Sequence, residues 1–135
     1  MATIVFFSIP AQGHVHPTLG VVRELTARGH RVIYYSYEGF REKIHAAGGE
    51  FVGCERLDPT MRLTRQAGAR VGSDLALSTR VLVDTLLALD EPVCREMERL
   101  RPDCIVGDSM AVWAKTAAQK LGIPYVCSMT TFAFN

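Results

Sequence analysis

The 135-residue sequence has almost no excess of charge: 15 lysines and arginines oppose 14 aspartates and glutamates, for a formal net charge of +1. This balance gives no electrostatic reason to expect a nucleic acid or an anionic membrane as partner. No apolar run approaches the ~20 residues of a membrane span, and the apolar start lacks the basic segment of a signal peptide. We therefore expect a cytoplasmic protein without a membrane span.

The four cysteines form no C-x-x-C pair, and no spacing of histidine, cysteine or carboxylate residues is typical of a metal site. Three of the four lie in apolar, strand-like runs, where a reduced cysteine behaves as a small core residue. We therefore expect no bound metal. An apolar content of 48% can fill the core of one domain, so we interpret residues 1–135 as a single domain.

The sequence does contain an alternation of short β-rich runs and helical periodicity, which is typical of a parallel sheet with helices on both faces. The predicted strands are 4–9, 31–37, 51–54, 104–108 and 125–129. The predicted helices are 17–28, 40–47, 74–89, 93–100 and 110–121, and 58–73 is a predicted mobile loop. Pro17 is expected at the first position of the first helix, and Pro92 is expected to break or kink the long helical region.

Right-handed crossovers predict the strand order 3-2-1-4-5, which makes the fold class α/β, with a Rossmann-like, doubly wound parallel sheet. The direction of winding reverses between the first and fourth strands, and ligands of such sheets bind at the carboxyl ends of the strands at that point. Segments 10–16 and 107–110 line this crevice, so we expect the functional residues there.

Glycine is scarce where a dinucleotide-binding fold needs it. Such a fold places G-x-G-x-x-G after its first strand, because glycines let the backbone approach a pyrophosphate. Here the segment 10–17 contains only Gly13. Glu38 does follow the second predicted strand, where the fold places an acid for the ribose, but this single match is weak. Dinucleotide binding therefore stays a disfavoured alternative.

The crevice segments instead supply His14 and Asp108. A helix N-terminus disfavours the imidazolium form and helps keep His14 neutral, and Asp108 can fix its tautomer and stabilise the cation formed in a transition state. Because no G-x-S-x-G nucleophile is present, this pair favours general-base activation of a substrate hydroxyl, worth about 10²- to 10⁴-fold in rate. Two simpler interpretations stay open: His14 as a surface or capping group, and Asp108 as the N-cap of the helix at 110–121.

The motif Gly-His-x-x-Pro at 13–17 is followed by Thr-Leu and by Glu-Leu-x-x-Arg-Gly-His-Arg-Val at 24–32. Together with Ile-Val-Gly-Asp-Ser-Met-Ala-Val-Trp-Ala at 105–114, it resembles family 1 glycosyltransferases of the GT-B fold. The bacterial macrolide and antibiotic glycosyltransferases are the most similar group. The resemblance is strong over 3–54 and 103–131 and poor over about 58–100.

The resemblance implies inverting transfer from a UDP- or dTDP-sugar donor to an apolar, hydroxylated small molecule such as a macrolide or a polyphenol. It gives His14 the role of catalytic base and Asp108 that of the acid orienting it, without a metal or a cofactor. Trp113 is more simply interpreted as core or pocket wall. The residues expected around the acceptor are Gln12, Gly13, Met61, Trp113, Thr130, Phe132 and Phe134.

Two departures from the family pattern stand out. His16 precedes the helix proline where the family has Asn, and the poorer N-cap is expected to cost about 1 kcal/mol. The donor-binding domain is missing from these residues, so we expect an incomplete N-terminal, acceptor-binding domain that does not turn over sugar nucleotide alone. The alternatives are a non-catalytic binding module and one subunit of a split glycosyltransferase.

Overall fold

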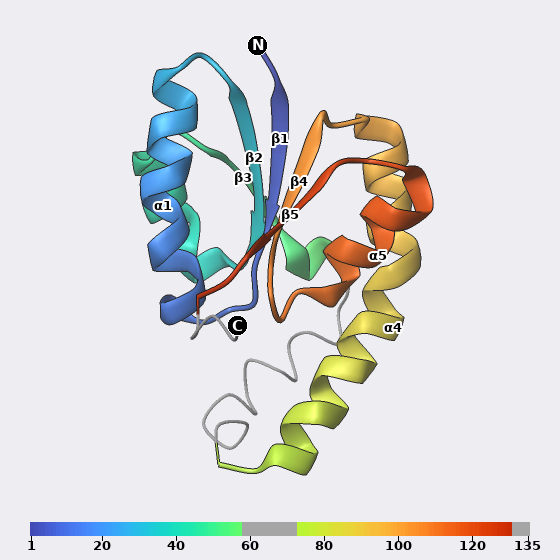
Figure 1. Ribbon diagram of the computed structural model, residues 1–135. Coiled ribbons are helices and arrows are strands. Elements are labelled where there is room, and N and C mark those ends of the chain that lie inside the picture. The colour runs from blue at the N-terminus through green and yellow to red at the C-terminus, as the bar shows by residue number, and fades with distance from the viewer. Residues whose placement is uncertain (58–72, 131–135) are drawn as a thin grey trace.

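The computed structural model describes residues 1–57 and 73–130. Its centre is one parallel sheet with the strand order β3-β2-β1-β4-β5 (Figure 1), which confirms the predicted order. The strands are β1 (Thr3–Phe7), β2 (Arg31–Ser36), β3 (Glu50–Gly53), β4 (Cys104–Asp108) and β5 (Tyr125–Ser128). The predicted first strand was too long at its end: Ile9 lies beyond β1, although its side chain still packs against the core.

Helices cover both faces of the sheet, as Figure 1 shows: α1 lies on one face, and α4 and α5 lie on the other. The helices are α1 (Gln12–Ala27), α2 (Arg41–Ala46), α4 (Leu75–Leu100) and α5 (Val112–Leu121), with the short 3-10 turns η1 (Glu38–Phe40) and η2 (Cys54–Arg56). No helix in these described ranges is both long and apolar enough to cross a bilayer. The predicted loop 58–73 lies outside the described residues, apart from Ser73.

The alternation of side chains along the central strands produces two cores, one on each face of the sheet. Phe6 packs in the core beneath α1 and α2, and its ring stacks on Tyr34 with the centroids 5.4 Å apart. Phe7 packs in the core beneath α4 and α5, and its ring stacks on Tyr35 at 4.7 Å. Because both faces of β1 are covered, the strand is a continuous apolar run, and only its ends are left for polar chemistry.

The first helix begins earlier than the sequence predicted. Pro17 is not its first residue but lies inside α1, which starts at Gln12 with Ala11 as the N-cap. Pro17 cannot donate to the carbonyl of Gly13, yet the preceding turn is helical because Val15 is completely buried, and burying such a side chain contributes about 1.5–3 kcal/mol. His16 is therefore not the N-cap, and the expected capping cost there is wrong.

The second proline prediction also fails, because α4 is one continuous helix through Pro92. Proline in a helix interior costs about 3 kcal/mol or more. Leu89, Val93 and Met97 are fully buried on the face that packs on the sheet, and each contributes about 1.5–3 kcal/mol, which outweighs that cost. The predicted start is confirmed: the side chain of Asp74 caps α4 by accepting the Leu77 N–H.

Candidate active site

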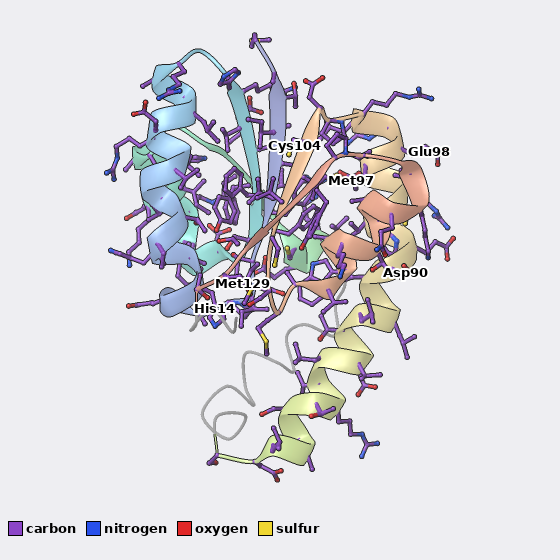
Figure 2. All side chains as sticks on the ribbon, in the orientation of Figure 1. His14, Asp90, Met97, Glu98, Cys104 and Met129 are labelled. Atoms are coloured by element: carbon purple, nitrogen blue, oxygen red, sulfur yellow. The ribbon has the colours of Figure 1, made fainter. Side chains whose placement is uncertain are left out.

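The carboxyl ends of β1 and β4 lie side by side in the middle of the sheet, with Phe7 opposite Gly107. From there the chain enters α1 on one face and α5 on the other (Figure 1). Ligands of open α/β sheets bind in the crevice between two such connections. His14 and Met129 lie at this edge, whereas Cys104, the first residue of β4, lies farther toward the opposite end (Figure 2). The carboxyl ends of the two strands are therefore adjacent, as the sequence predicted.

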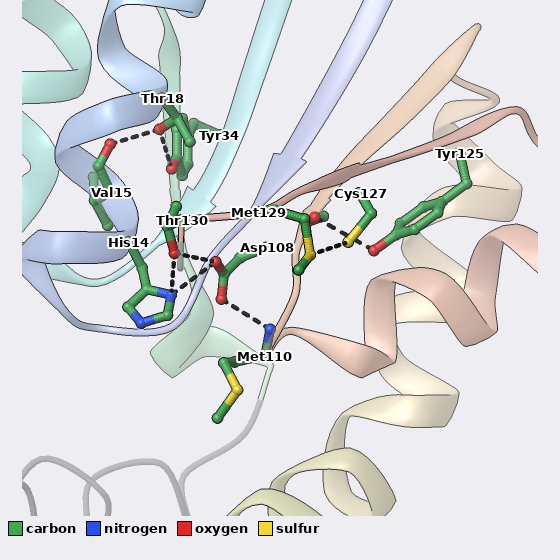
Figure 3. A network of polar contacts seen from close by, with 11 residues as sticks. His14, Val15, Thr18, Tyr34, Asp108, Met110, Tyr125, Cys127, Met129 and Thr130 are labelled. Carbon is green, nitrogen blue, oxygen red and sulfur yellow. Dashed lines mark hydrogen bonds and ion pairs between the residues drawn. The ribbon is translucent and has the colours of Figure 1, made fainter. Parts of the chain in front are cut away.

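The crevice brings together His14 and Asp108, as Figure 3 shows. The Nδ1 atom of His14 lies 2.8 Å from Oδ1 of Asp108, although the residues are 94 positions apart in sequence. The side chain of Asp108 is fully buried, while that of His14 is 18% exposed. His14 is the third residue of α1, so its ring stands beside the positive end of the helix dipole. One ring nitrogen is thus held by the protein and the ring keeps contact with solvent.

Asp108 bonds to the backbone of the following turn as well as to His14. Its Oδ2 accepts a hydrogen bond from the backbone N–H of Met110 at 3.0 Å. The N-cap of α5 is Ala111, so Asp108 is not the N-cap, and the predicted helix start at Met110 is two residues too early. Asp108 instead holds the turn before α5 with one oxygen and His14 with the other. Such pairing is required because an unpaired buried carboxylate is strongly destabilising.

The contact between His14 and Asp108 determines the tautomer of the imidazole. A carboxylate can only accept, and two acceptors 2.8 Å apart would repel each other, so the hydrogen must lie on Nδ1 of His14. In the neutral ring the other nitrogen, Nε2, then carries the lone pair. A ring in this state can take a proton at Nε2 while Asp108 stabilises the resulting cation.

Gly107 is required immediately before Asp108, because a side chain there would collide with the ring of Tyr125. The hydroxyl of Tyr125 donates to the carbonyl of Gly107 at 3.4 Å. Burial raises the pKa of Tyr125 to about 12, with a smaller contribution from nearby negative charge, so the phenol stays protonated and keeps its donor. This contact fastens β5 to the end of β4 and helps fix the position of Asp108.

A buried hydroxyl pair beneath the crevice was not predicted from the sequence. The Thr18 hydroxyl donates to the carbonyl of Val15 at 2.6 Å and meets the Tyr34 hydroxyl at 2.7 Å. Burial raises the pKa of Tyr34, and the negative charge of Asp108 adds to this rise. The pair ties α1 to β2 one helical turn after His14. The signal in the sequence was a threonine inside a predicted helix, whose hydroxyl needs a partner when it is buried.

The remaining predicted site residues are placed unevenly. Gln12 and Gly13 lie exposed in the first turn of α1, beside His14. Trp113 belongs to the core cluster and is 1% exposed, which favours the core interpretation, and its indole N–H has no partner within the described ranges. Thr130 lies against His14 and Asp108. The other three, Met61, Phe132 and Phe134, lie outside the described residues.

Within residues 1–57 and 73–130, no group of three or more histidine, cysteine or carboxylate side chains is arranged to hold a metal ion. The four cysteines are free thiols, and burial raises the pKa of Cys54 well above its usual range. Cys54 therefore behaves as a core residue and not as a reactive thiol.

No protein-family model matches the chain, but individual proteins do. The NDP-glycosyltransferase YjiC of Bacillus subtilis is 32% identical over 135 residues, which cover 98% of this chain and 33% of that protein. Demethyllactenocin mycarosyltransferase of Streptomyces fradiae is 33% identical over 145 residues, covering 100% of this chain and 31% of that protein. The solved structure of the glycotransferase of kitacinnamycin matches with a TM-score of 0.79 and 28% identity, covering 98% of this chain and 31% of that one.

The chain spans about a third of the length of the curated relatives that it matches. The likeness in sequence extends over nearly all of its residues, and the likeness in structure extends over the same part. The parallel sheet and its strand order are those that the sequence predicted. The chain is therefore a homologue of the macrolide and antibiotic glycosyltransferases of family 1, which have the GT-B fold, and corresponds to about a third of their length.

Proposed function

We propose that the full-length protein is an inverting glycosyltransferase that moves a sugar from a nucleotide-sugar donor to a hydroxyl of an apolar small molecule. In this proposal the present chain binds the acceptor and supplies the base. The observation that carries it is the 2.8 Å contact between His14 Nδ1 and Asp108 Oδ1, at the edge of the sheet where such folds bind ligands. The contact leaves Nε2 of a partly exposed ring as the atom that takes the proton.

The proposed reaction begins with the acceptor hydroxyl donating to Nε2 of His14. As the proton moves to Nε2, the acceptor oxygen attacks the anomeric carbon from the face opposite the diphosphate. The bond between the anomeric carbon and the diphosphate oxygen breaks, and the nucleoside diphosphate leaves with the electron pair. Attack from the opposite face inverts the anomeric configuration. A positioned base of this kind is typically worth about 10²- to 10⁴-fold in rate.

Asp108 acts on this step through its charge. When His14 gains the proton, a neutral ring beside a carboxylate becomes an ion pair in a buried setting, where the attraction is stronger than in water. The fully buried carboxylate of Asp108 is already held by the Met110 N–H, so it does not have to reorient during the reaction. This preorganisation supports a role as orienting group and not as a second base.

The substrate class is supported by the relatives and by the chemistry of the site. One relative is named as an NDP-glycosyltransferase and another as a mycarosyltransferase acting on demethyllactenocin. Among the described residues, the His14–Asp108 pair supplies a base and no side chain is arranged as its nucleophile. This suits direct transfer to a substrate hydroxyl, which requires no covalent intermediate. We propose a macrolide-like or polyphenolic acceptor, with Gln12 and Gly13 beside it.

The test is His14→Gln in the full-length protein, with His45→Gln as the matched control. His45 lies exposed near the end of α2 and is not part of the crevice. Acceptor-dependent release of nucleoside diphosphate is measured for both variants. We expect kcat to fall at least about 10²-fold for His14→Gln and to stay within about 2-fold for His45→Gln. Retention of more than a tenth of the activity by His14→Gln would falsify the proposed base.

A further inference from the structure

Thr130 closes a triangle of polar atoms with the histidine and the aspartate of the crevice (Figure 3). Its Oγ1 lies 3.0 Å from Nδ1 of His14 and 3.4 Å from Oδ1 of Asp108. Thr130 follows β5, which pairs with β4 so that Ser128 lies opposite Asp108. The three corners of the triangle therefore come from α1, from β4 and from the segment after β5.

The hydrogens of the triangle can be arranged in only one satisfactory way. Nδ1 of His14 carries a hydrogen because it faces a carboxylate, so the Thr130 hydroxyl cannot donate to it and must accept there. Its own hydrogen then points to Oδ1 of Asp108, which can only accept. The one hydrogen on Nδ1 is thus shared between Oδ1 of Asp108 and Oγ1 of Thr130, while the Thr130 hydroxyl donates to the carboxylate. This arrangement requires the hydrogen to stay on Nδ1.

We propose that Thr130 is a positioning residue for the reaction, one that fixes the rotation and the tautomer of His14 and keeps Nε2 directed at the acceptor. This inference rests on the proposed function. One hydrogen bond, to Asp108, leaves the imidazole able to rotate around that contact. A second contact, from Thr130 on another element, restricts this rotation. Small losses of alignment matter, because the acceptor oxygen must meet both the base and the anomeric carbon.

The contacts around the end of β5 argue against a purely structural role for the Thr130 hydroxyl. The end of β5 is already tied to the β4 connection by the Ser109 N–H, which donates to the carbonyl of Ser128 at 3.1 Å. Tyr125 adds a second tie through Gly107. The hydroxyl of Thr130 is therefore not needed to hold the strand, and both of its contacts are directed at His14 and Asp108.

The first experiment compares Thr130→Val, which removes the hydroxyl, with Thr130→Ser, which keeps it. The full-length protein is labelled with ¹⁵N in the histidine rings, and NMR spectra are recorded without substrates. His14→Gln assigns the His14 signals among the four histidines of this chain. We expect Nδ1 of His14 to carry the hydrogen in the native protein, and we expect that hydrogen to shift and to exchange faster with water in Thr130→Val. Thr130→Ser restores the native signals.

His30 is an internal reference for the same spectra. The Ala2 N–H donates to Nδ1 of His30 at 3.1 Å, so the neutral His30 ring carries its hydrogen on Nε2, which is the opposite tautomer. The His30 signals should be identical in all the variants. A change in them would show that Thr130→Val disturbs the sheet as a whole and would overturn the positioning role.

Kinetics separate positioning from substrate binding. We expect kcat of Thr130→Val to fall about 2- to 10-fold, the effect of losing one net hydrogen bond, with KM for donor and acceptor unchanged and with recovery in Thr130→Ser. Unchanged His14 signals in Thr130→Val, or a higher KM at constant kcat, would refute the inference. The NMR measurement needs no turnover, so it stands even where the protein shows no glycosyl transfer.

Discussion

The two ends of the central strands carry the same residue types and use them differently. At the carboxyl end, His14 and Asp108 bond to each other inside the crevice. At the amino end, Asp103 bonds to the backbone of Thr3, the first residue of β1, and His30 bonds to the backbone of Ala2 just before it. One edge of the sheet thus has a histidine–aspartate pair, and the other has a histidine and an aspartate that serve the main chain separately.

The contacts at the amino end are hydrogen bonds that hold the start of β1 in place. Nδ1 of His30 accepts the N–H of Ala2 at 3.1 Å, and Oδ2 of Asp103 accepts the N–H of Thr3 at 2.7 Å. Without these side chains, the N–H groups of Ala2 and Thr3 would form hydrogen bonds with water. The lone pair on Nδ1 of His30 is occupied by the backbone N–H of Ala2, so Nδ1 acts as an acceptor in this ring and as a donor in His14.

The difference between the two edges shows that burial and the choice of partner make a site, and that residue type alone does not. Asp108 is fully buried and its two oxygens bind three groups, the His14 ring, the Thr130 hydroxyl and the Met110 N–H. Asp103 is exposed and stabilises through one charge-assisted hydrogen bond. A buried carboxylate acts on a neighbouring imidazole through a weakly screened charge, whereas an exposed one is screened by water.

The largest effect is expected from Asp108→Asn, compared with Asp103→Asn. An asparagine at 108 has no charge to stabilise a protonated His14, and its NH₂ group can face Nδ1 and force the hydrogen onto Nε2. We expect kcat for glycosyl transfer by the full-length protein to fall at least about 10²-fold. Asp103→Asn should leave kcat within about 2-fold. Steady-state rates of nucleoside diphosphate release measure both.

An equal fall in kcat for Asp103→Asn and Asp108→Asn would contradict the proposed difference between the two ends of the sheet. Equal losses would mean that the strand as a whole, and not the pair at its carboxyl end, controls the rate. The melting temperature of each variant separates these cases, because a general loss of structure lowers both activity and stability.

The pair at the carboxyl end could be predicted from the sequence because it depends on topology. Strands 1 and 4 were recognisable as apolar runs, and the handedness of crossovers made them neighbours. The residues that follow neighbouring parallel strands must meet at one edge of the sheet, so the sequence alone predicts that His14 and Asp108 lie close together. The residues at the amino ends of neighbouring strands also meet at one edge of the sheet. In the sequence, however, His30 and Asp103 cannot be distinguished from ordinary surface residues.

The start of α1 and the role of Thr130 could not be predicted, for two physical reasons. Pro17 is a strong local signal for a helix start, and it was outweighed by the burial of Val15, which depends on packing against the sheet. Thr130 lies beyond the last strand, where no periodicity fixes the direction of a side chain. It was predicted near an acceptor, and its two contacts with the histidine and the aspartate became visible only in three dimensions.

A smaller effect is expected from His30→Ala, which tests the fastening at the amino end. The variant leaves the N–H of Ala2 without its acceptor, and we expect the free energy of unfolding to fall by about 1 kcal/mol. His30→Asn, whose side-chain oxygen can replace Nδ1 as an acceptor, should recover most of the loss. Denaturant titration measures both variants. Because His30 is at the opposite edge from the crevice, kcat should not change, and a large fall in kcat would contradict the division between the two edges.

The smallest effect is expected at an exposed ion pair that also lies at the amino end of the sheet. Nε and Nη2 of Arg31, at the start of β2, donate to the two carboxylate oxygens of Glu50, at the start of β3, at 2.8 and 2.9 Å. The hydrogen bonds from Arg31, and then its positive charge, hold the pKa of Glu50 below its ordinary value. Both side chains are about half exposed, so solvent screens the pair and its contribution is smaller than that of His30.

The pH dependence of this pair has a definite sign. A carboxyl whose pKa is lower in the folded than in the unfolded protein stabilises the fold at pH values above its ordinary pKa. That contribution disappears as the pH falls through the lowered, folded-state pKa. Glu50→Gln should therefore be slightly less stable than the native protein at neutral pH and equal to it in acid, with the difference closing below the ordinary pKa of a glutamate. Thermal unfolding across this pH range measures how the stability difference between Glu50→Gln and the native protein disappears. A difference independent of pH would show that Glu50 acts by packing and not by charge.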